Sequence, residues 1–334
     1  MLRGLESQNI LVAKGALGIA YVTAGAVYFS LKKVWNMTTE RREPVFPWYE
    51  KVKLEQQSLE TEDTHNKSGE TVYEYQFRAR LLGVLALRGV FEFLGGFFYI
   101  FCLKMALEYG VNQGVSSCML SMAGLIITVA SCLIYDERLN VPQCIGIISM
   151  MTALPFLGMY AVRPTELGVS HLSFTEMVKV GLPGLCSAVS FSLEALLIRY
   201  CANRGVSGMD GGFICVSFNG VFSCIILACI ASSNTLPLSV FFNLFLAGLC
   251  TTSAIVLVNV AVVHGEAGIA FSIGNSFPCW HSIYNTVVVG QPLSLGQIMG
   301  VVLVVLGSIV LSVHDHIDCC TRKPSKEEEE VAGN

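Results

Sequence analysis

The chain has 334 residues, of which 53% are hydrophobic and only 14% are charged, and its mean hydropathy is +0.60. Because a soluble domain carries about 25% charged residues, this composition excludes a soluble globular protein and makes lipid the solvent for most of the chain. The formal net charge of −4 comes largely from four glutamates at residues 327–330, and no basic stripe indicates nucleic acid binding.

Nine apolar runs are long enough to cross a bilayer as helices, because a span needs about 20 residues. In chain order they are residues 10–32, 82–107, 114–135, 142–162, 177–201, 211–232, 238–263, 268–289 and 293–313. These runs predict an all-α fold, a polytopic membrane bundle with about nine spans.

A polar loop at residues 35–76 separates the first two runs, and it has no apolar stretch long enough to cross. Residues 46–49 read Phe-Pro-Trp-Tyr, and their aromatic rings predict a short helix in the headgroup layer. Lys and Arg gather in this loop and at later turns, which predicts a cytoplasmic loop, an outside N-terminus and a cytoplasmic C-terminus. The plasma membrane and the membranes of the secretory pathway both fit.

A ten-residue motif at residues 137–146 returns 154 positions later at residues 291–300. Both copies read x-x-Leu-polar-apolar-x-Gln-apolar-apolar-Gly, and both lie between apolar runs. A Gly-x-x-Gly match between residues 15–18 and 181–184 makes the first run the counterpart of the fifth.

An odd number of spans in each repeat inserts the two halves in opposite senses, and inverted repeats are typical of secondary transporters. The expected organisation is a first repeat at residues 1–165, a second repeat at 166–316 and a cytoplasmic polar tail at 317–334.

Residues 106–110 read Ala-Leu-Glu-Tyr-Gly, a span follows, and Glu137-Arg138-Leu139 with Gln143 and Gly146 opens the next span. In this pattern the chain resembles the drug/metabolite transporter superfamily, with its EamA-like and nucleotide-sugar transporter groups, over about residues 82–313. The resemblance implies a carrier with a plan of about ten helices, in two inverted repeats around a central cavity. The first half departs from that plan, because the polar loop occupies the place of the family's second helix.

Polar and ionisable side chains at bilayer depth are the candidate binding residues, since each is costly there unless it faces a cavity or a partner. The substrate-binding candidates are Glu92, Lys104, Glu194, Asn259, Ser272, Asn275, Ser276 and His281.

Each of these candidates also has a structural interpretation. The hydroxyls and amide of the eighth run, at residues 272–276, line a cavity or join helices by hydrogen bonds. Glu92 and Glu194 suit proton carriage or a cationic substrate group, and the alternative is an ion pair with Arg88 or Arg199 respectively. Lys104 attracts an anionic substrate group or extends to the interface.

The predicted function is secondary transport of a small organic metabolite by alternating access, with a nucleotide sugar or similar anion as one substrate class. The missing helix motivates the alternative, a non-transporting scaffold, receptor-like protein or degenerate paralogue. No phosphate-binding loop or hydrolase motif is present in the sequence, so neither an enzyme nor a cofactor or metal is expected. The expected partners are the substrate and the lipid bilayer, and Gly296-x-x-x-Gly300 packs two helices of one chain or of a homodimer.

Overall fold

The structure is a computed structural model. It describes residues 7–38, 45–53, 73–135, 140–159, 162–165, 168–171, 173–230, 237–265, 270, 274, 277–291 and 293–321.

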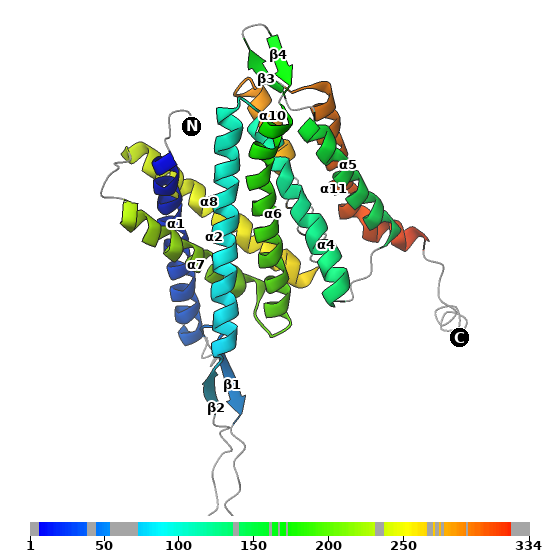
Figure 1. Cartoon of the computed structure of the whole chain (residues 1–334). Helices are drawn as coiled ribbons and strands as arrows, with labels where there is room; N and C mark the ends of the chain where they lie inside the picture. Colours follow the sequence, from blue (N-terminus) through cyan, green and yellow to red (C-terminus); the bar gives the residue numbers. More distant parts are fainter. Residues whose placement is uncertain are drawn as a thin grey trace, which may run out of the picture. The chain divides into compact units, whose positions relative to one another are not determined.

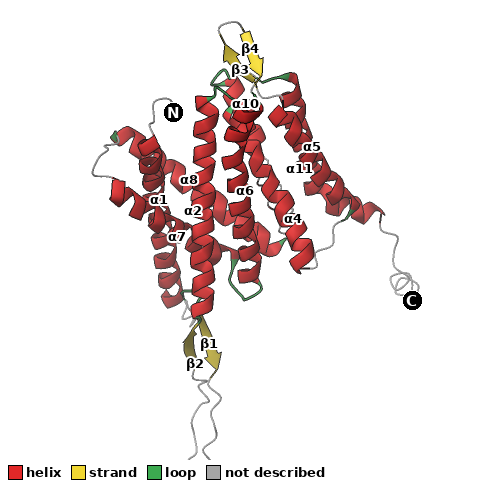
Figure 2. Ribbon diagram, viewed as in Figure 1, coloured by secondary structure: helices red, strands yellow, loops and turns green. Residues whose placement is uncertain are grey.

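Each of the nine predicted runs contains helix, which confirms the all-α membrane bundle (Figures 1 and 2). The helices are α1 Ser7–Thr38, α2 Ala79–Glu108, α3 Gln113–Ser117, the 3₁₀ turn η1 Cys118–Ser121, α4 Met122–Tyr135, α5 Val141–Met159, α6 Phe174–Ala202, α7 Gly208–Ile230, α8 Leu238–His264, α10 Phe277–Val287 and α11 Leu295–Thr321. Within the described ranges, α2, α6, α7 and α8 are long and apolar enough to cross a membrane.

Two short antiparallel hairpins accompany the helices. β1 Tyr49–Lys53 pairs with β2 Tyr73–Phe77, and β3 Val162–Thr165 pairs with β4 Gly168–His171. The predicted interfacial helix at residues 46–49 is therefore wrong, because the chain turns there and Tyr49 begins β1. Four residues are too few to nucleate a helix, whereas Tyr49 gains backbone hydrogen bonds by pairing with Phe77.

The chain forms two compact units. The first combines residues Leu94–Leu196 with the chain from His264 onward, and the second combines Ser7–Phe93 with Leu197–Val263. Each unit draws segments from both predicted repeats, and α2 and α6 contribute to both units. The repeat boundaries at residues 165 and 316 stay predictions.

The repeated motif is a helix start signal. The backbone N–H of Asn140 donates to the side-chain oxygen of Gln143 over 2.6 Å, and the N–H of Ser294 donates to Gln297 over 2.9 Å. Asn140 precedes α5 and Ser294 precedes α11, so each glutamine is the third helical residue of a capping box. Both glutamine side chains are fully buried. The spacing between the polar residue and the glutamine in the motif is thus explained by capping.

In the first unit α5 packs along α11, and equivalent positions of the two halves meet. The Ser149 hydroxyl donates to the carbonyl of Leu303 over 2.9 Å, 154 residues away. A Cβ on Gly307 would lie 2.7 Å from the carbonyl oxygen of Gly146, so only glycine allows this approach. The two copies of the ten-residue motif thus lie on two helices that pack against each other.

In the second unit α1 packs along α7 through a reciprocal glycine contact. A Cβ on Gly18 would lie 2.9 Å from the Gly220 carbonyl oxygen, and a Cβ on Gly220 would lie 2.8 Å from the Gly18 carbonyl oxygen. The backbones of α1 and α7 therefore approach each other closely at these two glycines.

Candidate functional site

Three ionisable side chains are buried in the apolar helices α1 and α2 of the second unit. Lys14 is 3% exposed, Arg88 is 1% exposed and Glu92 is 8% exposed. Charged groups at bilayer depth are costly and mark functional sites in membrane proteins. These residues define the polar cluster of the second unit.

Arg88 connects α2 to both α7 and α8 by hydrogen bonds. Its Nη2 donates to the side-chain oxygen of Asn259, and its Nη1 donates to the carbonyl of Gly211 over 3.3 Å. The Asn259 amide nitrogen donates in turn to the backbone carbonyl of Ile255 over 2.8 Å. A Cβ on Gly211 would lie 3.0 Å from Nη1, so glycine leaves room for the guanidinium group. Asn259, a binding candidate from the sequence, thus accepts a hydrogen bond from Arg88. The sequence had indicated Arg88 only as a partner for Glu92.

Glu92 faces α1. Lys14 of that helix interacts electrostatically with the Glu92 carboxylate, and its ammonium nitrogen lies 5.4 Å from the centre of the Phe93 ring. The charge of Glu92 also acts on the buried Tyr21 hydroxyl. Sequence reasoning missed Lys14 as a partner, although a lysine inside the first apolar run was the available signal.

An ion pair joins α1 and α7 between the last turns of α1 and the first turn of α7. Lys32 Nζ lies 2.7 Å from an Asp210 carboxylate oxygen, and the Tyr28 hydroxyl donates to the same carboxylate over 2.9 Å. Asp210 also accepts from the Ser207 hydroxyl over 2.9 Å, and the Asp210 N–H donates back to that hydroxyl. The Ser207 hydroxyl thus caps the N-terminus of α7, and Asp210 has a structural role in holding it.

Lys104, in the first unit, pairs on its own helix with Glu108, with 3.3 Å between the ammonium nitrogen and the carboxylate oxygen. The two side chains are 21% and 50% exposed. This geometry fits a lysine that extends toward the interface. Glu194 of α6 is buried in the same unit, as the sequence predicted for a carboxylate deep in a span.

His281 belongs to a polar group in the first unit that comes from three helices. Its Nδ1 lies 3.5 Å from the Ser117 hydroxyl of α3, which lies 3.3 Å from the Tyr99 hydroxyl of α2. The other candidates of this run, Ser272, Asn275 and Ser276, lie outside the described residues. Their role in lining a cavity stays a prediction.

The chain is similar to transporters by sequence and to a solved structure by fold. Residues 180–313 match the EamA-like transporter family. A crystal structure titled only as that of a protein superposes with a TM-score of 0.56 at 16% identity, over 93% of this chain and 90% of that chain. No curated protein matches the sequence. The chain therefore carries an EamA-like domain at residues 180–313 and has the helical fold of an integral membrane protein.

Proposed function

We propose that the protein is a secondary transporter that moves a small organic metabolite by alternating access, and that the substrate carries an anionic group. The observation that carries this proposal is the polar cluster of Lys14, Arg88 and Glu92. It sets two cations against one carboxylate inside apolar helices. An anionic substrate group would be attracted to the net positive charge of these three groups, because charges interact strongly at bilayer depth.

Arg88 is the residue best suited to hold that group. A guanidinium presents its N–H donors in a planar fork that matches a carboxylate or phosphate. Asn259 and the Gly211 carbonyl fix this fork in place, so little side-chain entropy is lost when a ligand binds. The Lys14–Glu92 interaction lies one helical turn away on α2 and supplies a second charge that can exchange partners during the cycle.

The contact between the two copies of the repeated motif supports alternating access. A carrier with inverted repeats can adopt two states that open to opposite sides and are related by its pseudo-symmetry. Ser149 of α5 and Leu303 of α11, which are equivalent in the sequence repeat, are joined by a hydrogen bond.

Counterflow into liposomes tests the proposal. The purified full chain is reconstituted in liposomes loaded with one compound from a panel of nucleotide sugars, carboxylates and phosphate esters. We expect counterflow for at least one anion, its loss in Arg88→Gln, and a partial loss in Arg88→Lys, which keeps the charge without the fork. Lys179→Gln, an exposed lysine near the start of α6, is the matched control and should transport normally.

Two results would contradict the proposal. Counterflow that survives Arg88→Gln unchanged would refute the assigned site. Binding of a panel compound without flux would favour a non-transporting, receptor-like protein.

We also propose that the α2 start and the α6–α7 turn lie on the cytoplasmic side, with the C-terminus. Arg78, Arg80 and Arg204 gather there, and positive residues mark cytoplasmic ends. The acceptor sequences beginning at Asn36 and Asn66 should then stay without glycan after expression in a eukaryotic cell. A glycan on either asparagine would contradict the proposed orientation.

A further inference from the structure

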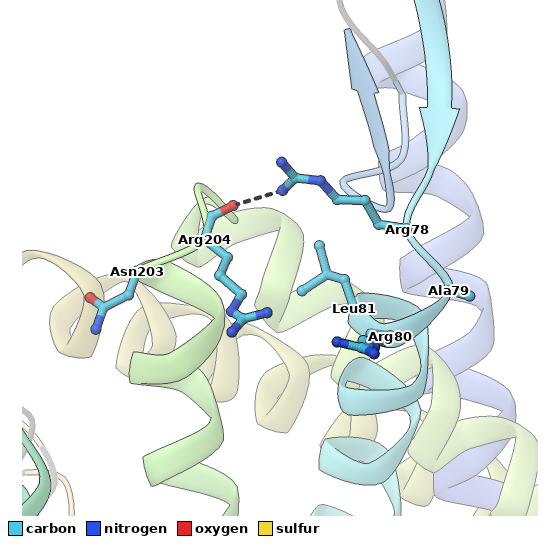
Figure 3. Close-up of a pocket in the computed structure, with 6 residues that line it drawn as sticks. All are labelled: Arg78, Ala79, Arg80, Leu81, Asn203 and Arg204. Atoms are coloured by element: carbon cyan, nitrogen blue, oxygen red, sulfur yellow. Dashed lines mark hydrogen bonds between the residues drawn. The ribbon is translucent and has the colours of Figure 1, made fainter. Parts of the chain in front are cut away.

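A basic pocket lies in the second unit, where α2 begins and α6 passes into α7 (Figure 3). Its volume is about 610 Å³, and it is lined by Arg78, Ala79, Arg80, Leu81, Asn203 and Arg204. Three of these six residues are arginines and none is acidic. The two lining segments are far apart in the sequence, so only the fold creates this concentration of positive charge.

Two of the arginines are held in position. Arg78 Nη1 donates to the Arg204 carbonyl over 3.4 Å, the contact drawn in Figure 3. The Arg204 guanidinium carbon lies 4.0 Å from the centre of the Tyr200 ring. Stacking on a ring uses the face of a guanidinium group and leaves its in-plane N–H groups directed at acceptors.

The acidic residue that follows the pocket in sequence does not neutralise it. Asp210 is six positions beyond Arg204 and is engaged by Lys32, Tyr28 and Ser207. Its charge is therefore compensated on the α1 side.

Aromatic rings beside the pocket indicate its depth. The rings of Phe46 and Trp48 stack with centres 4.7 Å apart, and Phe29 packs on Phe46 at 5.1 Å. The Trp48 carbonyl accepts the backbone N–H of Arg78 over 2.7 Å, which joins these rings to the pocket wall. Aromatic side chains gather at the level of the lipid headgroups. The pocket therefore lies at the depth of the lipid phosphates.

We infer that this pocket binds a phosphate group, and that an anionic phospholipid of the surrounding leaflet supplies it. Arginine forks match phosphate oxygens, and basic pockets between helices on the cytoplasmic side bind anionic headgroups. Ala79 and Arg80, the first residues of α2, line the same wall, so the positive end of the helix dipole lies beside the pocket. This lipid site is separate from the transport site around Arg88 and does not depend on it.

The test is the binding of dioctanoyl phosphatidic acid to the purified full chain, followed as a rise in unfolding temperature with ligand concentration. Dioctanoyl phosphatidylcholine and inorganic phosphate are measured in parallel. We expect stabilisation by phosphatidic acid alone. Its apparent Kd should rise about tenfold in Arg80→Gln and again in Arg80→Gln/Arg204→Gln, since each removes a charged hydrogen bond.

Both arginines are exposed, so these variants should unfold at the wild-type temperature without ligand. Lys179→Gln removes one positive charge at the other end of α6 and should bind phosphatidic acid as the wild type does. Equal stabilisation by inorganic phosphate, lost in the same variants, would overturn the lipid as the source. Stabilisation by phosphatidic acid that persists in the double variant would overturn the pocket. Either failure leaves the counterflow result unaffected.

Discussion

The Ser149 hydroxyl donates a hydrogen bond to the carbonyl oxygen of Leu303, and the two residues are equivalent in the two halves of the chain. Their separation of 154 positions is also the separation of the repeated motif. Met150 and Val304, the next equivalent pair, lie in one buried cluster with Ala153 and Val301. The repeat that is visible in the sequence is thus a contact in the structure.

The glycine contact between α1 and α7 should tolerate no side chain. Gly18→Ala and Gly220→Ala each place a Cβ within 3 Å of a carbonyl oxygen, and we expect each to lower the free energy of unfolding by about 1–3 kcal/mol. Thermal unfolding in detergent measures this effect. Gly83→Ala is the matched control, because a Cβ there meets nothing within 4 Å, and it should be neutral or slightly stabilising.

The two capping boxes should contribute equally to their helices. Gln143→Ala and Gln297→Ala each remove the acceptor for the N–H of the residue before the helix, and each should cost about 0.5–2 kcal/mol. Denaturant unfolding of the two variants checks this value. Thr152→Ala, also in α5, removes an exposed hydroxyl that bonds to its own helix, and it should change stability little. An effect of Thr152→Ala as large as that of Gln143→Ala would contradict the capping role.

The Lys32–Asp210 pair should behave as one unit. Lys32→Met leaves a mostly buried carboxylate without its cation, and Asp210→Asn leaves the cation without its carboxylate. Each change should cost about 1–3 kcal/mol, and the double variant should cost less than the sum of the two. A double-mutant cycle by thermal unfolding measures this coupling. Additive single effects would show that the two charges are independent.

Lys104 should be dispensable for transport. Its partner Glu108 is on the same helix and is half exposed, and such pairs contribute about 0.3–0.5 kcal/mol. We expect Lys104→Gln to leave the KM of counterflow unchanged, while Arg88→Gln abolishes flux. A raised KM in Lys104→Gln would return this lysine to the binding site.

The helices could be predicted from the sequence because a lipid environment requires apolar side chains along the whole length of each span. Every span needs a long apolar run, and each of the nine runs contains helix. The repeated glutamines were also visible, although only the hydrogen bonds of Gln143 and Gln297 show what they do.

The errors arose where distant residues decide the outcome. Tyr49 lies in a strand because it pairs with Phe77, on the far side of a long loop. The sequence also did not indicate Lys14, which lies on another helix and interacts with Glu92. Apolar periodicity shows which residues form a helix and carries no information on which helices meet.

Gly18 and Gly220 each occupy the space that a side chain on the other would need. Because each glycine meets the backbone of the other, and backbone atoms cannot be replaced by smaller ones, no substitution at one position makes room for a Cβ at the other. The two positions are therefore constrained together, although they lie far apart in the sequence.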